Sequence, residues 1–242
     1  MVPQSGPWCG LYLRREVFGL LVGACLATGL GDRWATAQGD TAPELGRALG
    51  PGVPAGLLAE AEVHVSASLL QVVYRLSNAG GRDVGLLTRI ATVALDGGMR
   101  FDPSTTFVDL EGRTLILRRH ALRDGGVEAG VGLTLLRPGE SVQESVVLPI
   151  PVPICDPERR ARRIRGQPGT EVVARDPRRV ASIALVLGAA ELDPLWRLVS
   201  RSAEHPDILD PGPALARQAL LEISLPLDRS VEALDYETVR PT

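Results

Sequence analysis

The stretch LLQVVYRLSNAGGRDVGLL, residues 69–87, decides the fold that the sequence predicts. Its apolar residues recur at every second position from Leu70 to Leu76, which is the period of a β-strand with one buried face. The strand breaks at Ser-Asn-Ala-Gly-Gly, a run that favours tight turns, and apolar sequence resumes at Val84. We therefore expect two strands joined as a hairpin. The predicted core residues of the first strand are Leu70, Val72, Tyr74 and Leu76, with Arg75 facing solvent.

The rest of the chain repeats this pattern of short apolar strands separated by turn residues. The expected strands are residues 60–67, 84–93, 105–110, 114–119, 131–136, 142–150, 180–187 and 215–225. Short strands with frequent turns are typical of a β-sandwich or a barrel. Short helices are expected only at residues 43–49 and 195–202, the second of which carries Trp196.

The pattern Tyr74-x-Leu76-x-Asn78-x-Gly80, followed by Asp-Val-x-Leu, resembles one found in bacterial immunoglobulin-like and fibronectin-like domains. In those domains a strand ends in a hydrogen-bonded Asn-x-Gly turn. The resemblance covers Tyr74–Leu87 only, and it implies a non-enzymatic binding or scaffold module. We therefore predict a mostly β protein, an immunoglobulin-like antiparallel β-sandwich of seven to nine strands with one or two short helices.

Composition shifts along the chain predict its organisation. Residues 1–37 are expected to form a signal peptide, residues 38–58 a flexible arm, and residues 59–227 the β-sandwich domain. An Arg-rich insertion interrupts the domain at about residues 156–179, and residues 228–242 form a polar C-terminal tail.

The N-terminal segment has the features of an export signal. Arg14 and Arg15 precede an apolar run, Val17–Leu30, that is too short to span a bilayer, and a small-x-small site ends at Ala37. Two refinements stay open: the segment before Cys25 resembles a bacterial lipobox, and the paired arginines resemble a twin-arginine signal. The expected location is the periplasm or the cell envelope, and a lipid anchor on Cys25 as the first residue is the alternative to cleavage after Ala37.

Composition excludes several kinds of chemistry. The chain contains no Lys, so it cannot form a Schiff base through lysine or hold a nucleotide phosphate with a P-loop lysine. Its net charge of −3 gives no global electrostatic reason to expect nucleic acid, which is therefore disfavoured as a partner. No motif indicates a cofactor or a metal, so we expect neither.

Catalytic residue types are present but scattered. The histidines at 64, 120 and 205 are isolated in sequence, and no HExxH or CxxC spacing occurs. Cys155 is the only cysteine after residue 37, and no histidine near it in sequence would activate its thiol. The alternative to a binding module is a hydrolase whose site assembles from residues such as Ser104, Asp109 and His120.

One segment has a composition that suits a partner. Guanidinium groups bind phosphates and carboxylates through paired hydrogen bonds. The candidate residues for an anionic envelope component or an acidic protein partner are Arg159, Arg160, Arg162, Arg163 and Arg165. The sequence thus predicts an exported bacterial envelope protein that acts as a non-catalytic binding or structural module. A subunit of a larger envelope assembly is a further alternative.

We predict cleavage after Ala37, because the small residues at 35 and 37 suit a signal peptidase. Mass spectrometry of the protein exported from bacterial cells should then find Gln38 as the first residue, without palmitate labelling. A palmitate label that disappears in Cys25→Ala would contradict this and identify a lipoprotein.

Overall fold

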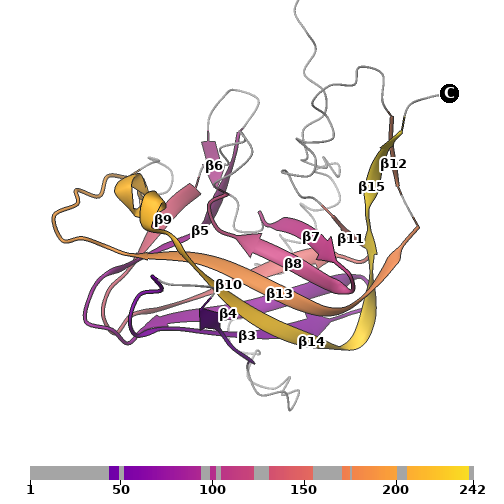
Figure 1. Ribbon diagram of the computed structural model, residues 1–242, viewed down its shortest axis with the longest axis horizontal. Helices are drawn as coiled ribbons and strands as arrows, with labels where there is room; N and C mark the ends of the chain where they lie inside the picture. The colour runs from indigo at the N-terminus through magenta and orange to yellow at the C-terminus, as the bar shows by residue number, and fades with distance from the viewer. Residues whose placement is uncertain are drawn as a thin grey trace, which may run out of the picture. The chain divides into compact units, whose positions relative to one another are not determined.

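The computed structural model in Figure 1 describes part of the chain. The described residues are 44–48, 52–93, 99–101, 105–122, 131–154, 171–174, 176–200 and 206–239. The chain divides into the units Met1–Ala42 and Pro43–Thr242, and the described residues belong to the second. Several predictions fall outside them: the signal peptide, Cys25, Ser104, Cys155 and the five arginines between 159 and 165.

The first sheet is antiparallel and has the strand order β1-β3-β4-β10. Its strands are β1 (Glu44–Leu45), β3 (Leu57–Val65), β4 (Leu69–Asn78) and β10 (Ser141–Pro149). Strands β3, β4 and β10 have nearly the bounds that the alternating pattern predicts.

The second sheet has nine strands and is mixed. Its strands are β2 (Arg47–Ala48), β5 (Val84–Val93), β6 (Met99–Phe101), β7 (Phe107–Glu111), β8 (Thr114–Arg119), β9 (Val131–Leu136), β11 (Val152–Pro153), β13 (Arg178–Glu191) and β14 (Ala219–Leu234). Two pairs are parallel, β8 with β13 and β11 with β14, and the others are antiparallel. A third, two-stranded sheet pairs β12 (Glu171–Ala174) with β15 (Tyr236–Val239).

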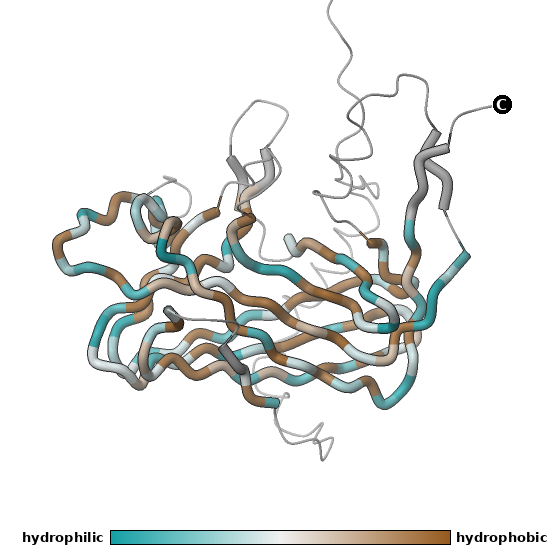
Figure 2. The backbone as a smooth tube through the Cα atoms, viewed as in Figure 1, coloured by the Kyte–Doolittle hydropathy of each residue, from teal (hydrophilic) through white to brown (hydrophobic). Residues whose placement is uncertain are grey.

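One core cluster joins the two larger sheets. Its members include Tyr74 of β4 and Val146 of β10 from the first sheet, and Leu117 of β8, Leu185 of β13 and Ile223 of β14 from the second. Figure 2 shows the alternation of apolar and polar residues along β3 and β4 that puts one face of the sheet in this core. The mostly β prediction is confirmed. The inward faces of Leu70, Val72, Tyr74 and Leu76 are also confirmed, since each is no more than 1% exposed, and Arg75 is exposed.

The predicted hairpin at residues 69–87 is wrong. Strand β4 pairs with β3 and β10 in the first sheet, whereas β5 pairs with β6, β9 and β13 in the second. The turn therefore carries the chain from one sheet to the other. Turn residues suit a crossing between sheets as well as they suit a hairpin, and the alternation of a strand does not say which neighbour fills its edges.

Asn78 links this crossing by hydrogen bonds to a second crossing, the turn between β9 and β10. Its side-chain amide nitrogen donates to the carbonyl oxygens of Arg82 (2.8 Å) and Leu136 (2.9 Å), and its side-chain oxygen accepts from the N–H of Gly80 (3.0 Å). Its backbone N–H and C=O bond to Glu140 and Gly139 in the turn between β9 and β10. The single Asn of the chain, 1% exposed, therefore ties two crossings between the sheets together.

Three further expectations are corrected. Residues 44–48, expected in a flexible arm with a helix at 43–49, form β1 and β2, which pair with β3 of one sheet and β14 of the other. Residues 228–234, expected as the start of a polar tail, continue β14 with Val231 and Ala233 buried. Residues 195–200 are not helical, and the one helix among the described residues is the short 3-10 helix η3, Gly212–Arg217.

Asn78→Ala should lower the free energy of unfolding by about 2–4 kcal/mol, because it leaves buried backbone groups of both crossings without partners. Urea unfolding followed by circular dichroism measures the effect. Ser77→Ala, which changes a half-buried neighbour on the opposite face of β4, is the control. Equal stability of the two variants would contradict the role assigned to Asn78.

Candidate functional site

Among the residues that the structure describes, the largest fully buried side chain is that of Arg119, at the end of β8. It lies where the second sheet branches: β13 pairs with β8 over residues 182–187 and with β5 over residues 189–191. The pairing of β5 with β9 is irregular between Leu86 and Arg89. The Arg119 guanidinium donates to the carbonyl oxygen of Thr88 in this irregularity, from Nε at 3.2 Å and from Nη2 at 3.1 Å. Arg119 thus satisfies backbone groups at the branch.

A buried carboxylate from the first sheet neutralises this guanidinium. Glu144 of β10 lies opposite Tyr74 of β4 in the ladder, and its Oε2 accepts a hydrogen bond from the Tyr74 hydroxyl. Arg119 Nη2 lies 3.5 Å from the same oxygen. Arg89 Nη2 lies 3.0 Å from Oε1, without the alignment of a hydrogen bond. These four side chains are hereafter the Arg119 network.

The Arg119 network is closed to substrates. The Arg119 and Glu144 side chains are 0% and 5% exposed. Burial raises the pKa of Tyr74 well above its usual range, and the Glu144 carboxylate raises it further, against the opposing effect of Arg119. The phenol therefore stays protonated and donates to Glu144. Groups that could serve in catalysis are bound to each other here, and the network joins the two sheets.

Of the residues suggested for a hydrolase, Asp109 and His120 do not meet, and Ser104 lies outside the described residues. Asp109 of β7 contacts Arg118 at 3.4 Å and lies opposite Ile116 in the ladder with β8. His120 follows four residues beyond Ile116, about 13 Å along the strand at the usual rise. Its Nδ1 lies 3.0 Å from the carbonyl oxygen of Ala121, and burial lowers its pKa, so the ring is neutral near pH 7.

The described residues contain neither a metal-binding cluster nor a membrane-spanning helix. Among these residues, no three His, Cys, Asp or Glu side chains gather in a group that could hold a metal ion. No helix in the same ranges combines the length and the apolar character needed to cross a membrane. A second candidate site lies on the surface.

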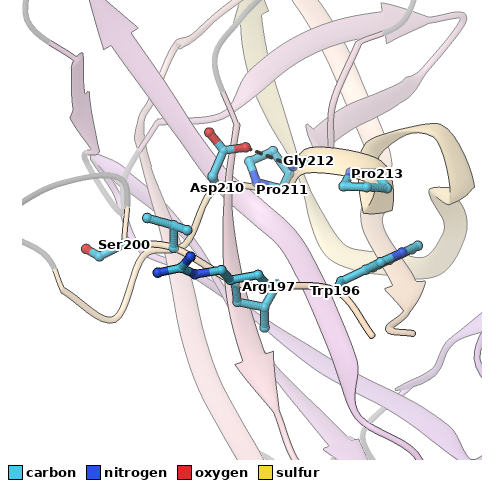
Figure 3. Close-up of a pocket in the computed structure, with 9 residues that line it drawn as sticks. Trp196, Arg197, Ser200, Asp210, Pro211, Gly212 and Pro213 are labelled. Atoms are coloured by element: carbon cyan, nitrogen blue, oxygen red, sulfur yellow. Dashed lines mark hydrogen bonds between the residues drawn. The ribbon is translucent and has the colours of Figure 1, made fainter. Parts of the chain in front are cut away.

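A cavity of about 240 Å³ lies in the connection between β13 and β14, residues 192–218 (Figure 3). The structure describes residues 192–200 and 206–218 of this connection. The cavity is lined by Trp196, Arg197, Leu198, Val199, Ser200, Asp210, Pro211, Gly212 and Pro213. In Figure 3 the indole of Trp196 and the guanidinium of Arg197 point toward opposite ends of this group.

The described parts of the connection are held by hydrogen bonds and packing although they are irregular. Leu209 exchanges two backbone hydrogen bonds with Leu133 of β9, at 2.9 and 2.8 Å, and the N–H of Asp210 bonds to the carbonyl of Val199 at 2.8 Å. Trp196, Leu198 and Leu209 pack against a small second core cluster under the connection. The sequence pointed to Trp196 but assigned it to a helix, because the pairing with β9 has no sequence signal.

The described parts of the connection carry three exposed apolar side chains. Leu195 is 91% exposed, Val199 54% and Leu215 38%. The Arg217 guanidinium lies over the Trp196 ring, 4.9 Å from its centroid. Exposed apolar groups next to Trp and Arg are typical of protein-binding surfaces. We call the cavity, these three residues and Arg217 the β13–β14 surface.

Comparisons with known proteins add no relative. No family model, no curated protein and no solved structure matches the chain.

Tyr74→Phe should change how stability depends on alkaline pH. The folded-state pKa of Tyr74 is raised, so its contribution is fully present below about pH 10 and is lost as the pH rises through the folded value. The chain has no Lys to titrate in this range. Urea unfolding between about pH 8 and 11 should show a steeper loss in the wild type than in Tyr74→Phe. Parallel losses would contradict the assignment.

Proposed function

We propose that this protein is an exported component of the bacterial cell envelope that acts as a non-catalytic binding module. The observation that carries the proposal is the β13–β14 surface, where Leu195 stands 91% exposed on a connection fixed by hydrogen bonds. Water disfavours such exposure, and a partner that covers the residue removes the cost. The same observation favours the subunit of an envelope assembly as a form of this function.

The buried polar groups support a binding role over catalysis. A catalyst needs a nucleophile, an acid or a base within reach of a substrate. Tyr74, Glu144 and Arg119 are instead enclosed by the fold and contact each other. His120 is buried with its Nδ1 against a backbone carbonyl.

We also propose that the fold is of the immunoglobulin-like sandwich type. Two sheets with a shared core and mostly antiparallel pairing support it, as do the two crossings held by Asn78. The parallel pairing of β8 with β13 departs from the antiparallel pattern. Export rests on the N-terminal signal features, and anion binding by Arg159–Arg165 stays a proposal from composition.

Fractionation of bacterial cells that express the chain should first place it in the envelope. A photoreactive residue at position 195 should then crosslink to an envelope protein in these cells. The matched control is position 58, because Leu58 is also an exposed Leu, 53% exposed, but lies on β3. A discrete crosslinked product from 195 and none from 58 is the expected result. Retention in the cytoplasm, or equal crosslinking from both positions, would refute the proposal.

A further inference from the structure

The acidic and basic residues in and next to the β13–β14 surface differ in the contacts that they make. Asp193 Oδ1 accepts the N–H of Leu195 at 2.9 Å, and Asp210 Oδ1 accepts the N–H of Gly212 at 2.8 Å, so both acids help to fix the connection. Arg197 and Arg217 have no carboxylate partner among the residues that the structure describes, and Arg217 contacts the Trp196 ring. Asp193 and Asp210 therefore each use one carboxylate oxygen on the backbone of the connection, whereas the Arg197 guanidinium has no such contact within the described residues.

The cavity suits one apolar side chain. Its volume of about 240 Å³ lies below the range of about 300–1,000 Å³ that is usual for sites that hold a whole small ligand. Trp196 and Pro213 lie at one end of the residues drawn in Figure 3, and the Arg197 guanidinium extends toward the other. The walls therefore offer an apolar end and a cationic end.

We propose that the β13–β14 surface binds a polypeptide segment that inserts an apolar side chain beside Trp196 and places a carboxylate on Arg197. The inference rests on the proposed binding function and names the chemistry of the partner. An Arg guanidinium binds a carboxylate through charge-assisted hydrogen bonds, and Trp and Arg are enriched at the energetic centres of interfaces. The carboxylate comes from an Asp or Glu side chain or from a chain terminus.

A polypeptide fits better than an anionic membrane surface. The described part of the connection carries Asp193, Asp207 and Asp210 against Arg197 and Arg217, so it has no excess of positive charge. Binding to anionic lipid scales with such an excess. Mixed charge around an apolar centre is instead the arrangement of a protein interface.

To test this, displayed random heptapeptides are selected for binding to the full chain. Binding of the enriched peptides is then measured by fluorescence anisotropy. Enriched peptides should pair an apolar residue with Asp, Glu or a free C-terminus. Arg197→Gln should weaken their binding about tenfold or more, and so should replacing their carboxylates by amides. Amidation of the side chain and of the C-terminus in separate peptides distinguishes the two sources of the carboxylate.

The matched control is Arg178→Gln, which removes an exposed arginine of β13 and should leave binding unchanged. Enrichment of nothing, enrichment of peptides without carboxylates, or equal binding by the two arginine variants would each overturn the proposed chemistry. If binding is lost in Leu195→Ser but kept in Arg197→Gln, the chemistry fails while the binding function stands. A concentration-dependent dimer in sedimentation, abolished by Leu195→Ser, would identify a second copy as the occupant and also overturn it.

Discussion

The structure depends on the pairing of Arg119 with Glu144 between the sheets. A guanidinium that is 0% exposed loses its hydration, a cost of several kcal/mol that only close partners offset. The Thr88 carbonyl and the Glu144 carboxylate supply those partners, and the Tyr74 hydroxyl completes the carboxylate. Removing the Glu144 carboxylate would leave the Arg119 guanidinium buried without a counter-charge, so the pair helps to fix which strands face each other.

The two sheets are joined by different means at their two sides. On the side of β10, the Arg119 network links strands of both sheets through side chains. On the side of β3, residues 44–48 do so through the backbone, because β1 pairs with β3 and β2 pairs with β14. Gly46 lies between them where a Cβ would come within 2.9 Å of the Ala59 Cβ, so the close approach requires glycine.

The sequence predicts the strands well because alternation is a local signal. Strands β5, β8 and β9 have the expected bounds, and β4 shows the expected inward face. The same alternation also held the signal for the buried pair. Arg119 continues the face of Leu115 and Leu117, and Glu144 stands between Val142 and Val146 on one face of β10. Opposite charges on two inward faces are a pattern that predicts a buried ion pair.

The remainder could not be predicted because it depends on contacts between distant residues. Nothing in residues 69–87 reveals that β10 occupies the edge of β4, and a strand with a filled edge cannot pair with its successor. The β13–β14 surface depends even more on distant contacts, because its geometry requires the backbone hydrogen bonds between Leu209 and Leu133 of β9. Local sequence shows Trp196 and two prolines there, but not whether they are ordered.

The order of that connection is what gives its exposed residues functional meaning. A flexible loop with Leu195 and Val199 would lose conformational entropy on binding, which weakens affinity. Here the hydrogen bonds to β9 and the packing of Leu198 and Leu209 have fixed the backbone before any partner arrives. A surface that is already ordered keeps more of the free energy of burying Leu195 as binding affinity. The contacts that hold the connection to the sheet therefore also prepare it for a partner.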